Sequence, residues 1–214
     1  MFALLPTIRL VKNERRFILK VIFLDIDGVL NGYSKWTDRV FGFANKVHLR
    51  RWLVRHYDIF GVRTYKVWLL KRIIEKTDAK IVLSSSWRGQ WNTPYEDCGP
   101  RMKILKRKFK RFGIRVYGVT GRSDNGKRES EIREWLSVHD KLNETYNDMS
   151  GGVIEKVESF VVLDDERSDL VGFIGKELVQ TSEVDTIRGY GYENTGLKRK
   201  HVKKAIKILN GGDN

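Results

Sequence analysis

The sequence predicts an α/β fold in which helices cover both faces of a parallel sheet. Three observations support this prediction. Short apolar runs with almost no polar interruption recur along the chain, as is typical of strands buried on both faces. Amphipathic helical patterns separate these runs, which indicates right-handed βαβ units. With 214 residues, 41% of them hydrophobic, the chain can bury a core, and we expect one domain over residues 1–214.

The expected strands are apolar runs that each stop at a polar residue. The first joins residues 17–19 to residues 21–24 and stops at Asp25. The others, in chain order, are residues 79–83, 114–119, 159–163 and 177–179. Because ligands of such sheets bind beyond the carboxyl ends of the strands, the residues that follow these runs are the first candidates for a site.

Four helices are expected where apolar residues recur every three or four positions. Three of them precede the second, third and fourth strands, and the last lies after the fifth. Their apolar stripes fall within residues 67–74, 102–112, 132–136 and 202–209. Each stripe gives its helix one face to pack against the sheet.

Oxygen-bearing side chains follow three of the expected strands. Asp25 and Asp27 follow the first, Ser84 follows the second, and Asp164 and Asp165 follow the fourth. Clustered carboxylates repel one another unless a cation lies among them, and oxygen ligands without Cys or suitably spaced His suit Mg²⁺. The sequence therefore predicts a magnesium site at this edge of the sheet.

Each of these features has a simpler explanation when it is taken alone. Asp-Gly is a common turn after a strand, acidic residues 164–166 could complement a helix N-terminus, and serines 84–86 could cap a helix. Their joint occurrence in this order, each after a buried strand, favours the site.

Charge is distributed unevenly along the chain. The sequence has 41 Lys and Arg against 27 Asp and Glu, a net charge of +14. Residues 1–122 hold 27 basic and 9 acidic residues, net +18, whereas residues 123–214 hold 14 and 18, net −4. A basic block attracts polyanions, so a polyanion such as RNA or DNA is an expected partner. The alternative is a basic surface that only keeps the protein soluble.

Composition excludes several classes of protein. No apolar run approaches the roughly 18 residues that a membrane span needs, so no membrane contact is expected. The single cysteine, Cys98, cannot form an internal disulfide or a Cys-based zinc site. We therefore expect no disulfide-linked partner and a cytoplasmic location.

Four segments resemble the motifs of the haloacid dehalogenase (HAD) superfamily of phosphatases: residues 23–30, 81–88, 127–136 and 161–166. The Leu-Ser-Ser-Ser-Trp-Arg form of the second motif and the Arg-x-x-Glu-Ile-x-x-Trp-Leu helix resemble a narrower group, the HAD domains of phages, bacteria and RNA-repair proteins. The resemblance implies a Rossmann-like core and a small or minimal helical cap at about residues 32–62. If the protein is phage-encoded, the expected location is the cytoplasm of the host.

The resemblance also implies a role for each acidic residue. Asp25 would be the nucleophile that forms an aspartyl-phosphate, and Asp27 would protonate the leaving oxygen and then activate water. Mg²⁺ would be held by Asp25, the Asp27 carbonyl and Asp164, while Asp165 either binds the metal or orients one of its waters.

Polar and basic residues complete the implied site. Ser84 would donate to a phosphoryl oxygen, with Ser85 or Ser86 as a substitute. Either Arg128 or Lys127 supplies the cation of the third motif, and the register favours Arg128. Arg88 either binds a second phosphate or stabilises the serine loop.

Three functions compete at this point. The leading one is a Mg²⁺-dependent phosphomonoesterase acting on a nucleic-acid end or a nucleotide. The second is a phosphatase of sugars or other metabolites whose basic surface is incidental. The third is a nucleic-acid-binding module without turnover, which the Asp25 and Asp27 pair disfavours because binding needs no general acid beside a nucleophile.

Overall fold

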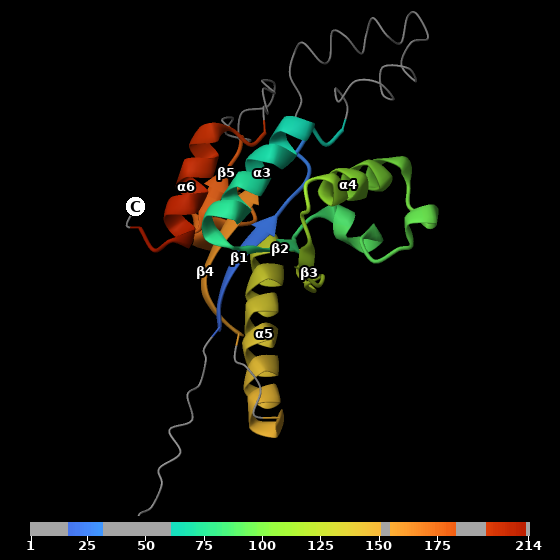
Figure 1. Cartoon of the computed structure of the whole chain (residues 1–214). Helices are drawn as coiled ribbons and strands as arrows, with labels where there is room; N and C mark the ends of the chain where they lie inside the picture. Colours follow the sequence, from blue (N-terminus) through green and yellow to red (C-terminus); the bar gives the residue numbers. More distant parts are fainter. Residues whose placement is uncertain (1–16, 32–60, 151–154, 183–195, 213–214) are drawn as a thin grey trace, which may run out of the picture.

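The structure is a computed structural model, and it describes residues 17–31, 61–150, 155–182 and 196–212. Within these residues, five strands form one sheet in the order β3-β2-β1-β4-β5, and every neighbouring pair is parallel (Figure 1). The predicted α/β fold with a parallel sheet is confirmed.

All five predicted strands are present. They are β1 (Phe17–Leu24), β2 (Lys80–Leu83), β3 (Val116–Val119), β4 (Glu155–Asp164) and β5 (Leu178–Gln180). Strand β1 lies in the centre, between β2 and β4, so its apolar residues from Val21 to Leu24 are completely buried. This position explains why the first run contains little polar alternation.

The four predicted helices are also present. They are α3 (Thr64–Thr77), α4 (Pro100–Arg111), α5 (Arg128–Ser150) and α6 (Arg199–Leu209). In the part of the chain that the structure describes, three short 3₁₀ helices lie in the connections: η2 (Ser86–Gln90), η3 (Tyr95–Asp97) and η4 (Val171–Phe173). Helix α5 is much longer than the apolar stripe at residues 132–136 suggested.

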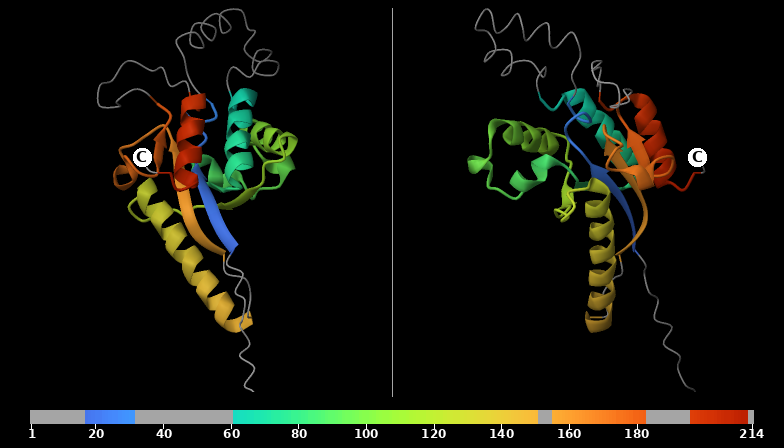
Figure 2. Two further views of the ribbon diagram at one scale, coloured as in Figure 1. Left: turned by 60° about the vertical axis from the view of Figure 1, so that its left-hand side comes forward. Right: turned by 180° about the vertical axis from the view of Figure 1, so that it is seen from behind.

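Side chains of β1 alternate between two cores. Ile22 and Leu24 belong to a cluster with residues of α3, α4 and α6, whereas Val21 and Phe23 belong to a second cluster on the α5 side. Phe23 meets Trp135 of α5 edge to face, with ring centroids 5.4 Å apart. Helices therefore cover both faces of the sheet, with α5 on one side and α3 and α6 on the other (Figure 2).

The cap expected at about residues 32–62 lies almost entirely at residues 32–60, outside the described residues. Among the residues that are described, no helix combines the length and the apolar character that crossing a bilayer requires.

Candidate active site

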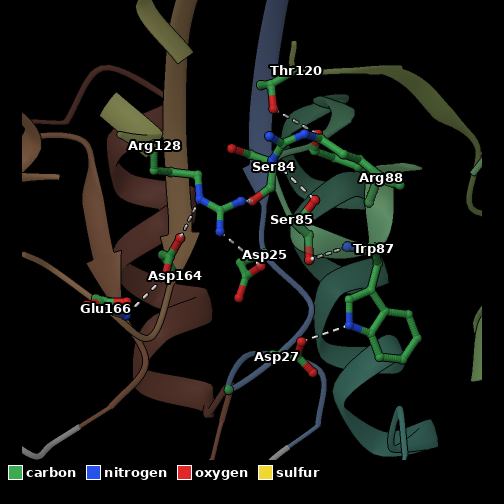
Figure 3. A network of polar contacts seen from close by, with 12 residues as sticks. Asp25, Asp27, Ser84, Ser85, Trp87, Arg88, Thr120, Arg128, Asp164 and Glu166 are labelled. Carbon is green, nitrogen blue, oxygen red and sulfur yellow. Dashed lines mark hydrogen bonds and ion pairs between the residues drawn. The ribbon is translucent and has the colours of Figure 1, made fainter. Parts of the chain in front are cut away.

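The ends of β1, β2 and β4 lie side by side. Leu24 is in register with Leu83 of β2 and Leu163 of β4, so Asp25, Ser84 and Asp164 occupy equivalent places at one edge of the sheet. The Asp25 N–H donates to the Leu163 carbonyl at 2.9 Å. Parallel pairing thus brings together residues that are far apart in the sequence (Figure 3).

Three carboxylates form a tight cluster at this edge. Asp25, Asp164 and Asp165 each place one oxygen within 4.8 Å of the others. Asp25 and Asp164 are only 6% and 4% exposed. An all-oxygen donor set with concentrated negative charge fits a hard divalent cation such as Mg²⁺. Asp27 is not part of this cluster through its side chain.

Burial shifts the titration of these groups. Desolvation raises the pKa of Asp25 to about 6, and the Arg128 guanidinium and a hydrogen bond from Ser85 oppose the rise. Desolvation and the neighbouring Asp25 carboxylate raise the pKa of Asp164 well above its usual range. The cluster therefore carries an electrostatic strain that a bound cation would relieve.

Arg128 reaches the carboxylate cluster, whereas Lys127 is exposed to solvent. Arg128 begins α5, and its Nη2 and Nε lie 3.8 Å from Asp25 Oδ1 and 3.9 Å from Asp164 Oδ2. The same guanidinium donates to the Ser84 carbonyl. Figure 3 shows Arg128 reaching between the two carboxylates. Lys127 is exposed on the preceding loop, where its backbone N–H donates to Asn125 Oδ1 at 2.9 Å.

The three serines after β2 have different environments. The Ser84 hydroxyl is buried, and within the described part of the chain it has no hydrogen-bond partner. Ser85 is completely buried, bonds to the Asp25 carboxylate and accepts from the Trp87 N–H. Ser86 is exposed. A buried hydroxyl without a partner is costly, so Ser84 is the serine that a ligand oxygen would satisfy.

Arg88 bonds to groups outside the carboxylate cluster. Its Nη2 donates to Glu131 Oε1 at 2.6 Å, and its Nη1 donates to the Ser85 carbonyl at 3.2 Å. The two side chains of the ion pair are 11% and 6% exposed. Glu131 lies one turn after Arg128 on α5, so this pair joins the serine loop to the helix that carries Arg128.

We expect Arg88→Gln to lower the free energy of unfolding by about 3 kcal/mol, because it leaves the buried Glu131 carboxylate without its partner. Arg133→Gln is the matched control, since Arg133 pairs with Glu129 on the same helix but its side chain is 56% exposed. That variant should lose less than about 1 kcal/mol. Urea denaturation of both variants measures the difference, and equal losses would contradict a structural role for Arg88.

Asp27 is held by two side chains. Trp87 Nε1 donates to Asp27 Oδ2 at 2.8 Å, and Asn31 Nδ2 donates to Asp27 Oδ1 at 2.7 Å. Neither donor is among the site residues predicted from the sequence. Asn31 could have been suspected from its place four residues after Asp27 in the same turn, whereas no local pattern joins Trp87 to Asp27.

The turn after Asp25 is fixed through its backbone carbonyls. The carbonyls of residues 28, 29 and 30 accept from the Thr181 hydroxyl at 2.8 Å, the Leu197 N–H at 2.9 Å and the Arg63 N–H at 2.8 Å. Gly196, with φ of +66°, lets this approach occur, because a Cβ there would lie 2.7 Å from two carbonyl oxygens of the turn. Three distant parts of the chain therefore shape the turn that carries Asp27.

The basic residues around α4 are only partly available to a ligand. Lys103 and Lys106 donate to the carbonyls of Glu96 and Thr93 at 2.7 and 2.6 Å, so they tie α4 to the η2–η3 segment. These two ammonium groups are therefore engaged within the protein, and they are less available to a polyanion than their neighbours. The exposed cations of this segment are Arg101, Arg107, Lys110, Arg111 and Arg115.

Comparison with known proteins identifies the family. A model of the HAD domain in Swiss Army Knife RNA repair proteins matches residues 21–187, a range that includes all four motif segments of the sequence. Comparisons with curated proteins and with solved structures give no significant match. Fold, acidic cluster and sequence match agree with the resemblance drawn from the motifs, and the chain belongs to the family of HAD domains found in Swiss Army Knife RNA repair proteins.

Proposed function

We propose that the protein is a Mg²⁺-dependent phosphomonoesterase that uses Asp25 as its nucleophile. The observation that carries this proposal is the buried Ser84 hydroxyl, which has no hydrogen-bond partner among the described residues and lies at the strand end next to that of Asp25. A metal-binding site alone would not need a free hydroxyl donor, whereas a phosphoryl group offers oxygens to both Ser84 and Arg128.

Asp25 and Asp27 divide the chemistry. An Asp25 carboxylate oxygen attacks phosphorus, the bond from phosphorus to the ester oxygen breaks, and Asp27 gives its proton to that leaving oxygen. The product of this step is a phosphoryl group bound to Asp25. Asp27, now ionised, takes a proton from water as the water oxygen attacks phosphorus, which releases inorganic phosphate and restores Asp25.

A metal ion, the Arg128 guanidinium and the Ser84 hydroxyl would together stabilise the phosphoryl oxygens. Asp25, Asp164 and Asp165 would hold Mg²⁺, with the Asp27 carbonyl as a further ligand implied by the family motif. The bound ion supplies charge that offsets repulsion between the Asp25 carboxylate and the phosphoryl group. Arg128 donates hydrogen bonds to phosphoryl oxygens from the α5 side, and Ser84 donates from the β2 side. Arg88 instead holds the serine loop.

We propose a phosphorylated end of RNA or DNA, or a nucleotide, as the substrate. Support comes from the association of this family with RNA repair proteins and from the exposed cations on and after α4. A polynucleotide bound by these cations would lose affinity as salt rises, because neutralised phosphates release counterions.

The test offers one protein several phosphate esters. The substrates are 3′-phosphorylated and 5′-phosphorylated oligonucleotides, mononucleotides, sugar phosphates and an aryl phosphate, each with Mg²⁺ and with EDTA, at two salt concentrations. We expect Mg²⁺-dependent phosphate release with the highest kcat/KM on a nucleic-acid or nucleotide substrate. Preference for sugar phosphates without salt dependence would instead identify a metabolite phosphatase. Binding of oligonucleotides without release from any ester would indicate a non-catalytic module.

Metal binding should stabilise the fold more strongly at neutral pH than in acid. Burial raises the pKa of Asp25 from 3.8 to about 6 in the folded protein, so the stability contributed by its protonated form is lost as pH rises through about 6. Mg²⁺ relieves that loss by binding the ionised form. We expect the increase in Tm on adding Mg²⁺ to be larger at about pH 7.5 than at about pH 5.5.

Thermal unfolding with and without Mg²⁺ measures this difference. Asp164→Asn should reduce the Mg²⁺-induced increase at both pH values, because one of the three clustered carboxylates is lost. An increase that is the same in the variant and the wild type would argue against the acidic cluster as the metal site.

A further inference from the structure

Within the described residues, a side chain donates a hydrogen bond to each carboxylate oxygen of Asp27. Trp87 holds Oδ2 at 2.8 Å and Asn31 holds Oδ1 at 2.7 Å. The Asn31 amide is itself oriented, because its Oδ1 accepts from the Gly28 N–H at 2.7 Å. Two donors on opposite oxygens fix both the position and the plane of the carboxyl group, while each oxygen keeps a second lone pair for a proton.

Trp87 is fixed in turn by the serine loop. Trp87 is the second residue of η2, and its backbone N–H donates to Ser85 Oγ at 3.4 Å. Its indole packs against the larger of the two core clusters. Figure 3 shows the indole reaching from this loop to Asp27. The loop that offers Ser84 to a phosphoryl group therefore also holds Asp27.

We infer that Trp87 and Asn31 are positioning residues for Asp27, and that Trp87 aligns the general acid with the phosphoryl group bound at Ser84. This inference rests on the proposed phosphatase function. A general acid acts only within hydrogen-bond reach of the leaving oxygen, and small misplacements of reacting groups cost large factors in rate. A carboxyl group without its Trp87 and Asn31 contacts would rotate freely relative to Ser84.

Comparing two leaving groups tests the role of Asp27 specifically. An alkyl phosphate needs a proton on its departing oxygen, whereas 4-nitrophenyl phosphate releases a stable phenolate and depends little on a general acid. We therefore expect Trp87→Phe, which keeps an aromatic ring but removes the N–H, to lower kcat/KM for an alkyl phosphate by about tenfold to a hundredfold. For 4-nitrophenyl phosphate the loss should stay below about threefold. Asn31→Ala should act in the same direction.

Two controls separate positioning from folding. Trp91→Phe makes the same change in the same segment, where Trp91 packs against Phe109 with ring centroids 5.9 Å apart, and it should leave both rates unchanged. Asp27→Asn should show the largest difference between the losses of kcat/KM on the alkyl phosphate and on 4-nitrophenyl phosphate. Adding Trp87→Phe to this variant should not lower kcat/KM for the alkyl phosphate further, because the carboxyl group that Trp87 positions is already absent.

The outcomes are distinct. If the wild type releases phosphate from neither ester, the phosphatase proposal fails and the inference falls with it. If the wild type is active but Trp87→Phe and Asn31→Ala lower both rates by the same factor, these residues serve only the fold and the inference alone is overturned. Additive losses in the Asp27→Asn, Trp87→Phe double variant would overturn it as well.

Discussion

Asp25→Asn will lower phosphate release by roughly 10³-fold or more while the protein becomes more stable without metal. The amide keeps the shape of the carboxylate but cannot attack phosphorus, so no phosphoryl group can be transferred to residue 25. It also carries no charge. Burial raises the pKa of Asp25 to about 6, which means that its ionised form is destabilised in the folded protein at neutral pH.

The two effects are measured on one preparation. Phosphate release gives the loss of turnover, and thermal unfolding in EDTA gives the gain in stability, with Tm expected to rise by about 2–4 °C for each kcal/mol recovered. Asp140→Asn makes the same change at an exposed position of α5 and should alter neither quantity. Equal activity of wild type and Asp25→Asn would remove Asp25 as the nucleophile.

Arg128→Ala will lower kcat/KM by about 10²-fold to 10³-fold, the second largest effect that we expect. The guanidinium lies 3.8 Å from Asp25 and 3.9 Å from Asp164, where it opposes their mutual repulsion and could reach the proposed phosphoryl group. Its removal also takes away a group that lowers the pKa of Asp25, so the acidic limb of the pH–rate profile should move to higher pH.

Lys127→Ala is the matched control, because it removes one positive charge at the adjacent but exposed position. We expect less than about a twofold change in kcat/KM from it, since exposed charges are screened. Arg128→Lys should retain part of the activity, because an ammonium group keeps the charge but loses the forked donor geometry. A large loss in Lys127→Ala together with normal activity in Arg128→Ala would assign the cation of the third motif to Lys127.

The sequence predicts the sheet and its carboxyl edge well for a physical reason. Strands such as β1 and β4 are buried on both faces, so their residues form uninterrupted apolar runs that stop where the backbone leaves the core. Asp25, Ser84 and Asp164 are found from that boundary alone. Parallel pairing then requires that they converge.

Contacts between side chains on different elements are not predictable in this way. The bond from Trp87 to Asp27 depends on how the η2 turn aims an indole across 60 positions of sequence, and no periodicity encodes that direction. The orientation of Arg128 relative to Lys127 depends on where α5 begins, and helix starts are poorly defined by sequence. The bond from Lys106 of α4 to the Thr93 carbonyl is likewise not predictable, because a pattern of side chains contains no information on backbone acceptors.

The turn after Asp25 can be completed only late in the synthesis of the chain. Its carbonyls are bonded by Arg63, Thr181 and Leu197, and the bond from Thr181 to Gly28 spans 153 positions. Contacts at such separation form late, because the intervening chain must first be ordered. A nascent chain that has not yet reached Leu197 already contains every acidic residue of the cluster, yet it lacks the hydrogen bond from the Leu197 N–H to the Val29 carbonyl. We therefore expect ribosome-bound intermediates that end before Leu197 to lack the proposed phosphatase activity.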